Sequence, residues 1–210
     1  MSGTSVGAID VAVGAQAWSA LGFAVDDGGV QIGATRLAIS ADGELGGLTG
    51  WELIAGDAAV AQSDDVDGIQ TRWAPVAEAP GTPPAHPNSA VRLDHVVVQT
   101  PDIDRTFAAL QQAGMTLRRE RNAGSTRQPL RQGFFRHGEA IVEVVGPAEV
   151  AGDGPASLWG IVVVIKDMDT AVAEMGDALG SPRDAVQPGR RIATVRAEAV
   201  AGLPLAVMTE

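Results

Sequence analysis

The sequence contains no cysteine and no tyrosine, and it has one lysine and no long hydrophobic run. Without cysteine the chain cannot form a disulfide, a thiolate nucleophile or a cysteine-ligated zinc or iron–sulfur site. The longest uninterrupted apolar run covers residues 161–165 and is far too short to cross a bilayer. Only His86, His95 and His137 can supply imidazole chemistry, and Lys166 lies in no glycine-rich phosphate-binding loop.

Charge is unevenly distributed along the chain. Residues 1–90 carry 2 basic and 11 acidic side chains, a net charge of −9, and residues 91–210 carry 13 and 15, a net charge of −2. The total of −11 makes nucleic acid a poor partner. No basic residue precedes Arg36 and Asp10 interrupts the first apolar stretch, so neither a secretory signal nor a membrane partner is predicted and a cytoplasmic location is expected.

The distribution of proline and an internal repeat divide the chain. Five of the twelve prolines lie between residues 74 and 90, which favours an extended linker there. The segment 93–104 recurs 65 residues later as 158–169, with five identities in twelve positions. This internal repeat predicts two similar structural units after the linker, at 91–147 and 157–210.

Each unit is predicted to fold as a strand, a helix and three further strands. The helices begin at Asp102 and Asp167 and end near Gly114 and Gly180. The later strands are expected at about 115–121, 132–137 and 140–145 in the first unit, and at about 183–187, 190–197 and 203–208 in the second. The whole chain is therefore predicted to be an α+β protein.

Residues 1–73 show a fainter version of the same pattern. A strand is expected at 8–13, a helix at 15–21, a set of strands between 23 and 40 turning at Gly28 and Gly29, and one more strand at 51–55. We interpret this region as one degenerate βαβββ-like unit.

The segments 93–98 (LDHVVV) and 138–147 (GEAIVEVVGP) resemble the vicinal oxygen chelate superfamily, which includes glyoxalase I, bleomycin-resistance proteins and extradiol dioxygenases. The similarity covers about 91–208 well and 6–56 weakly. It implies paired βαβββ modules whose sheet forms a cup, and a divalent metal held by His and Glu side chains from both modules.

Half of the metal-ligand pattern is missing from this sequence. His95 and Glu143 match two ligand positions of the resembled family, but Gly160 and Ala206 stand at the other two and offer no side-chain donor. The expected cofactor is therefore at most a divalent metal that binds weakly to His95 and Glu143. Both residues are also the candidate catalytic pair, with Glu143 as base and His95 as its partner. The alternatives are a hydrogen-bonded core histidine and an edge-strand glutamate facing water.

An excess of arginine follows the first helix, since six arginines between residues 118 and 136 are accompanied only by Glu120 among acids. Guanidinium groups bind carboxylates and phosphates through two hydrogen bonds, so the pattern predicts an anionic small-molecule ligand. The candidate ligand-binding residues are Arg118, Arg121, Gln132, Phe134, Arg190 and Arg191. The alternative is that the arginines form ion pairs with the acidic N-terminal region or a solvated face. Trp159 is expected in the core rather than in contact with ligand.

The sequence thus predicts a glyoxalase-like protein that binds a small molecule, with an unresolved reaction. One alternative is a metal-dependent lyase, isomerase or dioxygenase that uses His95 and Glu143. Another is a structural or interaction protein whose cup is filled by side chains. A homodimer is the form of assembly that the sequence leaves open.

Overall fold

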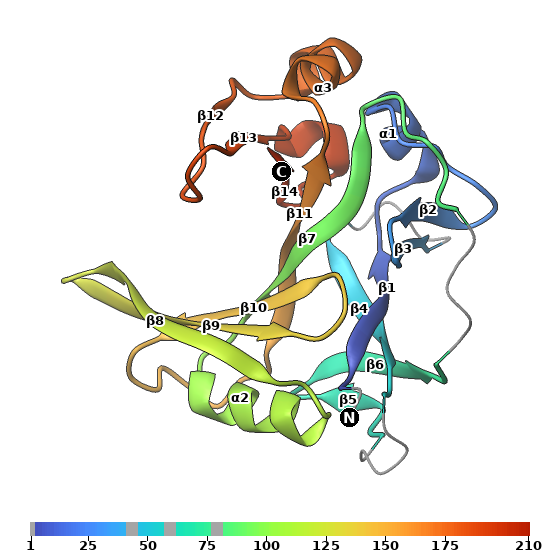
Figure 1. Cartoon of the computed structure of the whole chain (residues 1–210). Helices are drawn as coiled ribbons and strands as arrows, with labels where there is room; N and C mark the ends of the chain where they lie inside the picture. The colour runs from blue at the N-terminus through green and yellow to red at the C-terminus, as the bar shows by residue number, and fades with distance from the viewer. Residues whose placement is uncertain (1–2, 41–45, 57–61, 77–81) are drawn as a thin grey trace.

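The computed structural model describes residues 3–40, 46–56, 62–76 and 82–210, which form two mixed β-sheets with few helices (Figure 1). The C-terminal sheet has eight strands in the order β12-β13-β14-β11-β7-β10-β9-β8. The strands are β7 (Ala90–Gln99), β8 (Leu117–Ser125), β9 (Gln128–Arg136), β10 (Ile141–Pro147), β11 (Ser157–Ile165), β12 (Arg183–Asp184), β13 (Arg191–Thr194) and β14 (Leu205–Thr209). The helices of this half are α2 (Ile103–Gln112), α3 (Met168–Met175), η1 (Gly176–Ala178) and η2 (Ala197–Val200).

The eight-stranded sheet is built from two matching units, so the predicted α+β fold with paired βαβββ modules is confirmed. Within each unit the first strand pairs in parallel with the last, β7 with β10 and β11 with β14. The two units meet through the antiparallel pair of β7 and β11. His95 lies opposite Val162 and Gly160 lies opposite Val97, which is the register expected when a 65-residue offset relates the units.

Both helices of these units begin as predicted. The Asp102 carboxylate accepts a hydrogen bond from the Arg105 amide at 3.1 Å, and the Asp167 carboxylate accepts one from the Thr170 amide at 2.7 Å. These N-cap bonds satisfy amides that have no partner within the helix.

Strand lengths differ from the sequence prediction in both units. The hairpin of β8 and β9 is longer than expected, because Gly124 adopts a φ of +76° and the Ser125 hydroxyl accepts from the Gln128 amide, so the chain reverses only there. In the second unit β12 has two residues and β13 has four, so the strand predicted at 190–197 ends at Thr194 and the 3₁₀ helix η2 follows from Ala197.

The N-terminal sheet has six strands in the order β2-β3-β1-β4-β6-β5. Its elements are β1 (Ser5–Val11), α1 (Ala15–Ala20), β2 (Gly29–Ile32), β3 (Thr35–Ile39), β4 (Leu48–Ile54), β5 (Asp65–Val66) and β6 (Ile69–Ala74). Here β1 pairs in parallel with β3, β4 pairs in parallel with β6, and β1 and β4 are antiparallel. This pairing pattern resembles that of the C-terminal sheet with fewer strands.

The two sheets share one hydrophobic core, in which Trp18, Trp51 and Phe135 are fully buried. An ion pair between Arg105 Nε and Asp67 Oδ1, 2.6 Å apart, also joins the two halves. The described residues between β6 and β7 contain no helix or strand, as the prolines predict, although Pro80 lies outside them. No helix in the described ranges is long and apolar enough to cross a membrane.

Candidate active site

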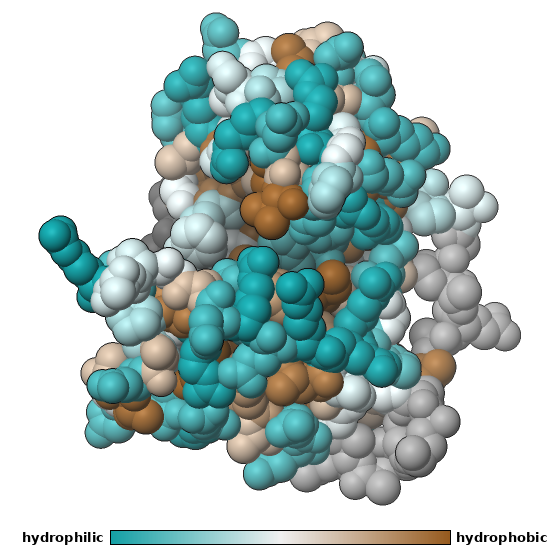
Figure 2. All heavy atoms as spheres, turned by 60° about the vertical axis from the view of Figure 1, so that its left-hand side comes forward, coloured by the Kyte–Doolittle hydropathy of each residue, from teal (hydrophilic) through white to brown (hydrophobic). Residues whose placement is uncertain are grey.

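The C-terminal sheet bends around a cavity of about 430 Å³, a volume typical of small-molecule sites. In Figure 1 the β8–β9 hairpin and the β12–β13 pair lie on either side of the central strands β7 and β11. Figure 2 shows this hollowed face, with hydrophobic atoms between hydrophilic rims. The cavity is lined by His95, Val97, Gln99, Gln132, Glu143, Val145, Trp159, Ile161, Val162, Arg183, Ile192, Thr194, Pro204, Leu205 and Ala206.

His95 and Glu143 come together on one wall of this cavity. They stand on the neighbouring parallel strands β7 and β10, and Val97 is the direct cross-strand partner of Glu143. The distance from His95 Nε2 to Glu143 Oε2 is 3.5 Å, and the two side chains are 17% and 14% exposed. The sequence therefore identified the two side chains that meet at the cavity.

Asp94 is a third member of this group that sequence reasoning missed. Leu93 pairs with Val163 and His95 pairs with Val162, so Asp94 has no cross-strand partner and forms a β-bulge in β7. A bulge interrupts the alternation of side chains, which brings neighbouring residues onto one face. The Asp94 Oδ2 atom consequently lies 2.8 Å from His95 Nδ1.

The Asp94 carboxylate is buried, with 6% of the residue exposed, and it is held ionised by its neighbours. Burial alone would raise the pKa of the Asp94 carboxyl. The hydrogen bond with His95 and the charges of Arg92 and Arg190 outweigh this effect, so the pKa lies below its ordinary value. Arg92 and Arg190 lie 3.3 and 3.5 Å from Asp94 Oδ1. Asp94 thus accepts the Nδ1 proton of His95 and fixes the ring.

The Nε2 atom of His95 faces the Glu143 carboxylate. With the Nδ1 proton donated to Asp94, a neutral His95 presents only a lone pair at Nε2, opposite the Glu143 carboxylate. The pair is therefore able to give a proton to a bound ligand or take one from it.

The other oxygen of Glu143 is held by a second hydrogen-bonded chain. Gln132 Nε2 donates to Glu143 Oε1 at 2.8 Å, and Arg121 Nε donates to Gln132 Oε1 at 2.6 Å. The Arg121 guanidinium also stacks over the Phe134 ring, 5.2 Å from its centroid. These contacts orient the carboxylate from the side opposite to His95.

The structure does not bring the predicted anion-binding residues together. Of that set only Gln132 is among the described residues that line the cavity, and Arg121 and Phe134 reach the site only through it. Arg190 is paired with Asp94, and Arg191 lies 3.5 Å from Asp169 at the surface. Arg118 donates to the Arg136 carbonyl. Arg118 lies exposed on the edge strand β8.

Two other residues line the cavity unexpectedly. Trp159 is 47% exposed, not buried in the core as predicted, because it is the unpaired residue of a second bulge, between Leu158 and Gly160. Arg183 projects from the short strand β12. Residue alternation along a strand could have found neither of them.

The donor set does not fit a complete metal centre. At Gly160 an added Cβ would lie 2.5 Å from the Pro204 carbonyl oxygen, so the backbone at Pro204 fills the space of a larger side chain there. Ala206 lines the cavity without a donor. No three His, Cys, Asp or Glu side chains in the described ranges could together hold a metal ion. His95 and Glu143 provide two ligands, whereas catalytic divalent sites usually have three or more.

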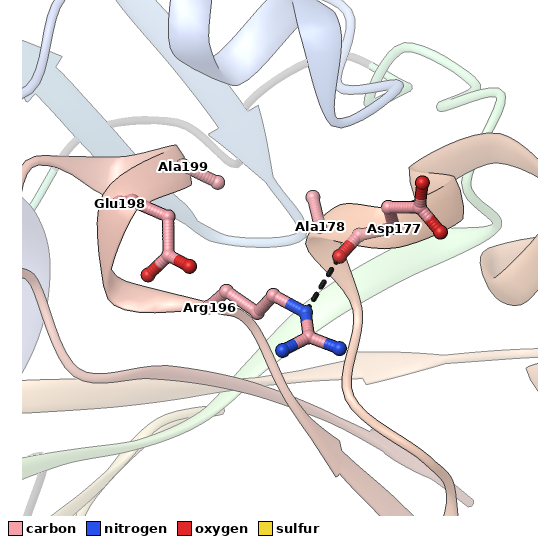
Figure 3. A pocket seen from close by; sticks show the side chains of 5 residues that line it. All are labelled: Asp177, Ala178, Arg196, Glu198 and Ala199. Atoms are coloured by element: carbon pink, nitrogen blue, oxygen red, sulfur yellow. Dashed lines mark hydrogen bonds between the residues drawn. The ribbon is translucent and has the colours of Figure 1, made fainter.

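A second hollow, of about 480 Å³, lies between η1 and η2 (Figure 3). Asp177, Ala178, Arg196, Glu198 and Ala199 line it. Arg196 Nε donates to the Asp177 carbonyl at 2.7 Å, which ties the two short helices together. This hollow contains no acid–base pair in contact, so the chemistry is concentrated in the cavity of the C-terminal sheet.

No protein-family model matches the sequence, and a search of curated proteins finds no match. Solved structures do match. A mutant of 4-hydroxymandelate synthase from Streptomyces coelicolor has a TM-score of 0.65 and 12% identity, covering 99% of this chain and 92% of that one. A xylose isomerase-like TIM barrel/4-hydroxyphenylpyruvate dioxygenase fusion protein has a TM-score of 0.64 and 10% identity, covering 98% of this chain and 48% of that one.

Methylmalonyl-CoA epimerase from Mycobacterium tuberculosis matches over 58% of this chain and 89% of its own, with a TM-score of 0.44 and 15% identity. The first two matches support, at the level of the fold, the resemblance of β7 and β10 to the vicinal oxygen chelate superfamily. Over nearly its whole length it is similar in fold to 4-hydroxymandelate synthase. At these identities the likeness defines the fold and not the reaction.

Proposed function

We propose that the protein binds a small organic molecule in the cavity of its C-terminal sheet and that Glu143 and His95 move a proton on that molecule. The observation that carries the proposal is the contact between His95 and Glu143 on the wall of a mainly apolar cavity. A charged pair placed beside apolar side chains is costly unless function or further hydrogen bonds compensate. The neighbours Asp94 and Gln132 supply those bonds from both sides.

The roles follow from the hydrogen bonds. Ionised Glu143 removes a proton from the ligand, and the charge on the carboxylate disappears as the proton arrives. The lone pair at Nε2 of neutral His95 then takes that proton from Glu143 and His95 returns it to another atom of the ligand, while Asp94 holds the imidazole in place. The apolar side chains on the cavity wall exclude water from this transfer. The overall change is an isomerisation, which needs no oxidant or reductant.

The two alternatives have less support. A metal-dependent lyase, isomerase or dioxygenase would need donors that Gly160 and Ala206 do not provide. A structural protein with a filled cup would leave no space, whereas a cavity of about 430 Å³ is present. A cytoplasmic location and a homodimer stay predictions of the sequence.

The proposal is tested by hydrogen exchange on bound ligands. A panel of carbonyl compounds with exchangeable C–H bonds is incubated with the protein in D₂O and followed by proton NMR. The native protein is expected to accelerate exchange of at least one compound. Glu143→Gln should keep the affinity for that compound and slow exchange by about 10²- to 10⁴-fold, the usual contribution of a positioned base.

Glu149→Gln is the matched control, since Glu149 is an exposed glutamate outside the cavity lining. It should leave exchange unchanged. Exchange that survives Glu143→Gln, or a panel in which no compound binds, would contradict the proposed function.

A further inference from the structure

We infer that the cavity takes a hydrophobic monocarboxylate, with the carboxylate on Arg183 and the apolar body against Trp159. This inference rests on the proposed function, because it names the ligand class of the same cavity. It places the anion on an arginine of β12 that the sequence prediction did not include.

Arg183 is the cavity arginine whose guanidinium is free. The guanidinium of Arg183 makes no hydrogen bond or ion pair with any residue that the structure describes. Two other arginines that contact residues of this site are engaged, Arg121 with Gln132 and Arg190 with Asp94. A guanidinium that faces a cavity with its hydrogen-bond donors unused is suited to a carboxylate, which accepts two of them at once.

The balance of charge in the cavity points to an anion with one charge. Among the described lining residues, the ionisable side chains are Glu143, His95 and Arg183. Glu143 faces His95 and accepts a hydrogen bond from the side-chain amide of Gln132. Arg183 alone is left without a counter-charge, and one guanidinium matches one carboxylate. The net charge of −11 disfavours more highly charged anions near the rest of the surface.

The other residues that line the cavity indicate that the rest of the ligand is apolar. Trp159 leaves nearly half of its surface exposed, although tryptophan is highly buried in most proteins. Its neighbours in the cavity are mainly aliphatic: Val97, Val145, Ile161, Val162, Ile192, Leu205 and Ala206. An exposed aromatic face beside an aliphatic wall gains free energy by covering an apolar group. A ligand held in this way directs its other end toward β7 and β10, where Glu143 and His95 stand.

The test compares acids with their neutral isosteres. Benzoate, 3-phenylpropionate and octanoate are each titrated beside the corresponding amide, with isothermal calorimetry and with tryptophan fluorescence. Trp159 is the reporter, because it is the one of the four tryptophans that lines the cavity as the structure describes it. At least one acid should bind tenfold or more tightly than its amide. Arg183→Gln should remove that preference and leave the affinity for the amide unchanged.

Matched variants separate this site from the rest of the surface. Arg191→Gln removes a nearby exposed arginine that is paired with Asp169 outside the cavity, and it should leave both affinities unchanged. Arg183→Lys keeps the charge and should keep part of the preference for the acid. Trp159→Ala should weaken the acid and its amide by the same factor, about tenfold.

Three results would overturn the inference: no acid binds more tightly than its amide, the preference survives Arg183→Gln, or it is lost in Arg118→Gln instead. The same experiments distinguish a failure of this inference from a failure of the proposed function. If neutral compounds bind and their exchange depends on Glu143, proton transfer stands and only the carboxylate subsite is wrong.

Discussion

The centre of the candidate site is a row of five side chains, Asp94, His95, Glu143, Gln132 and Arg121. The sequence indicated His95 and Glu143, since each is a polar residue in a strand of valine and isoleucine. It did not indicate Asp94 or Trp159, because each is the extra residue of a bulge and period-two alternation assigns it to the wrong face. Arg183 was missed since a two-residue strand has no readable pattern.

We predict that Asp94 is a positioning residue for His95. Asp94→Asn removes the negative charge that holds the Nδ1 proton, so His95 can adopt the wrong tautomer or rotate. Ligand exchange in D₂O should slow by about 10- to 100-fold, a loss similar to that from removing a carboxylate behind a ligating histidine. The affinity for the ligand should not change, because Asp94 does not line the cavity.

Asp169→Asn is the control for this prediction, because Asp169 pairs with Arg191 at the surface. Asp94→Glu should restore part of the exchange rate. Equal losses of affinity and rate in Asp94→Asn, tracking a lower melting temperature, would mean that Asp94 serves only the stability of β7.

At the scale of strands and helices, the hydrophobic pattern of the sequence predicted most elements of residues 91–210 correctly. The internal repeat located β7, β11 and both helices, because each strand is an apolar run followed by an aspartate N-cap. The repeat also identified Ala206 as the counterpart of Glu143. Glu143 pairs with Val97 in the first unit, and Ala206 pairs with the equivalent Val162 in the second. The N-terminal half was predicted less well, because β4, β5 and β6 have lost the strand and helix that would mark a unit.

We predict that a single substitution in β14 improves metal binding. Ala206 lines the cavity two strands from His95, so Ala206→Glu adds a third donor beside His95 and Glu143. The native protein should bind Mn²⁺ weakly, and treatment with EDTA should leave its melting temperature unchanged. The variant should bind Mn²⁺ at least about tenfold more tightly, about 1.4 kcal/mol, as measured by calorimetry.

Ala185→Glu is the matched control, since Ala185 lies outside the cavity lining. It should leave Mn²⁺ affinity unchanged. Tight, stoichiometric metal in the native protein would contradict the two-donor description of the site.

At the scale of the whole molecule, the segment between the sheets is part of the packing. Asn88 is fully buried, and its Nδ2 atom donates to the Leu21 carbonyl at 2.8 Å. His86 is 7% exposed, accepts from the Ala24 amide at Nδ1 and lies 2.9 Å from the Gln31 carbonyl at Nε2. Proline content predicted the absence of regular structure here but not the buried polar contacts, which depend on residues far away in the sequence. The segment therefore fixes the N-terminal sheet to the start of β7.

We predict that His86 makes the stability of the fold depend on pH. Burial lowers the pKa of the His86 imidazole and the Gln31 carbonyl partly opposes this, so the folded pKa lies below the ordinary value of 6.5. The unfolded chain therefore binds a proton first as the pH falls below about 6.5, and stability present above that pH is lost until the folded pKa is reached. Urea unfolding should show a lower free energy of unfolding at pH 5.5 than at pH 7.5. His86→Gln, which does not titrate, should be less stable at pH 7.5 and should lose less between the two values. An equal loss in both proteins would place the pH dependence at other groups.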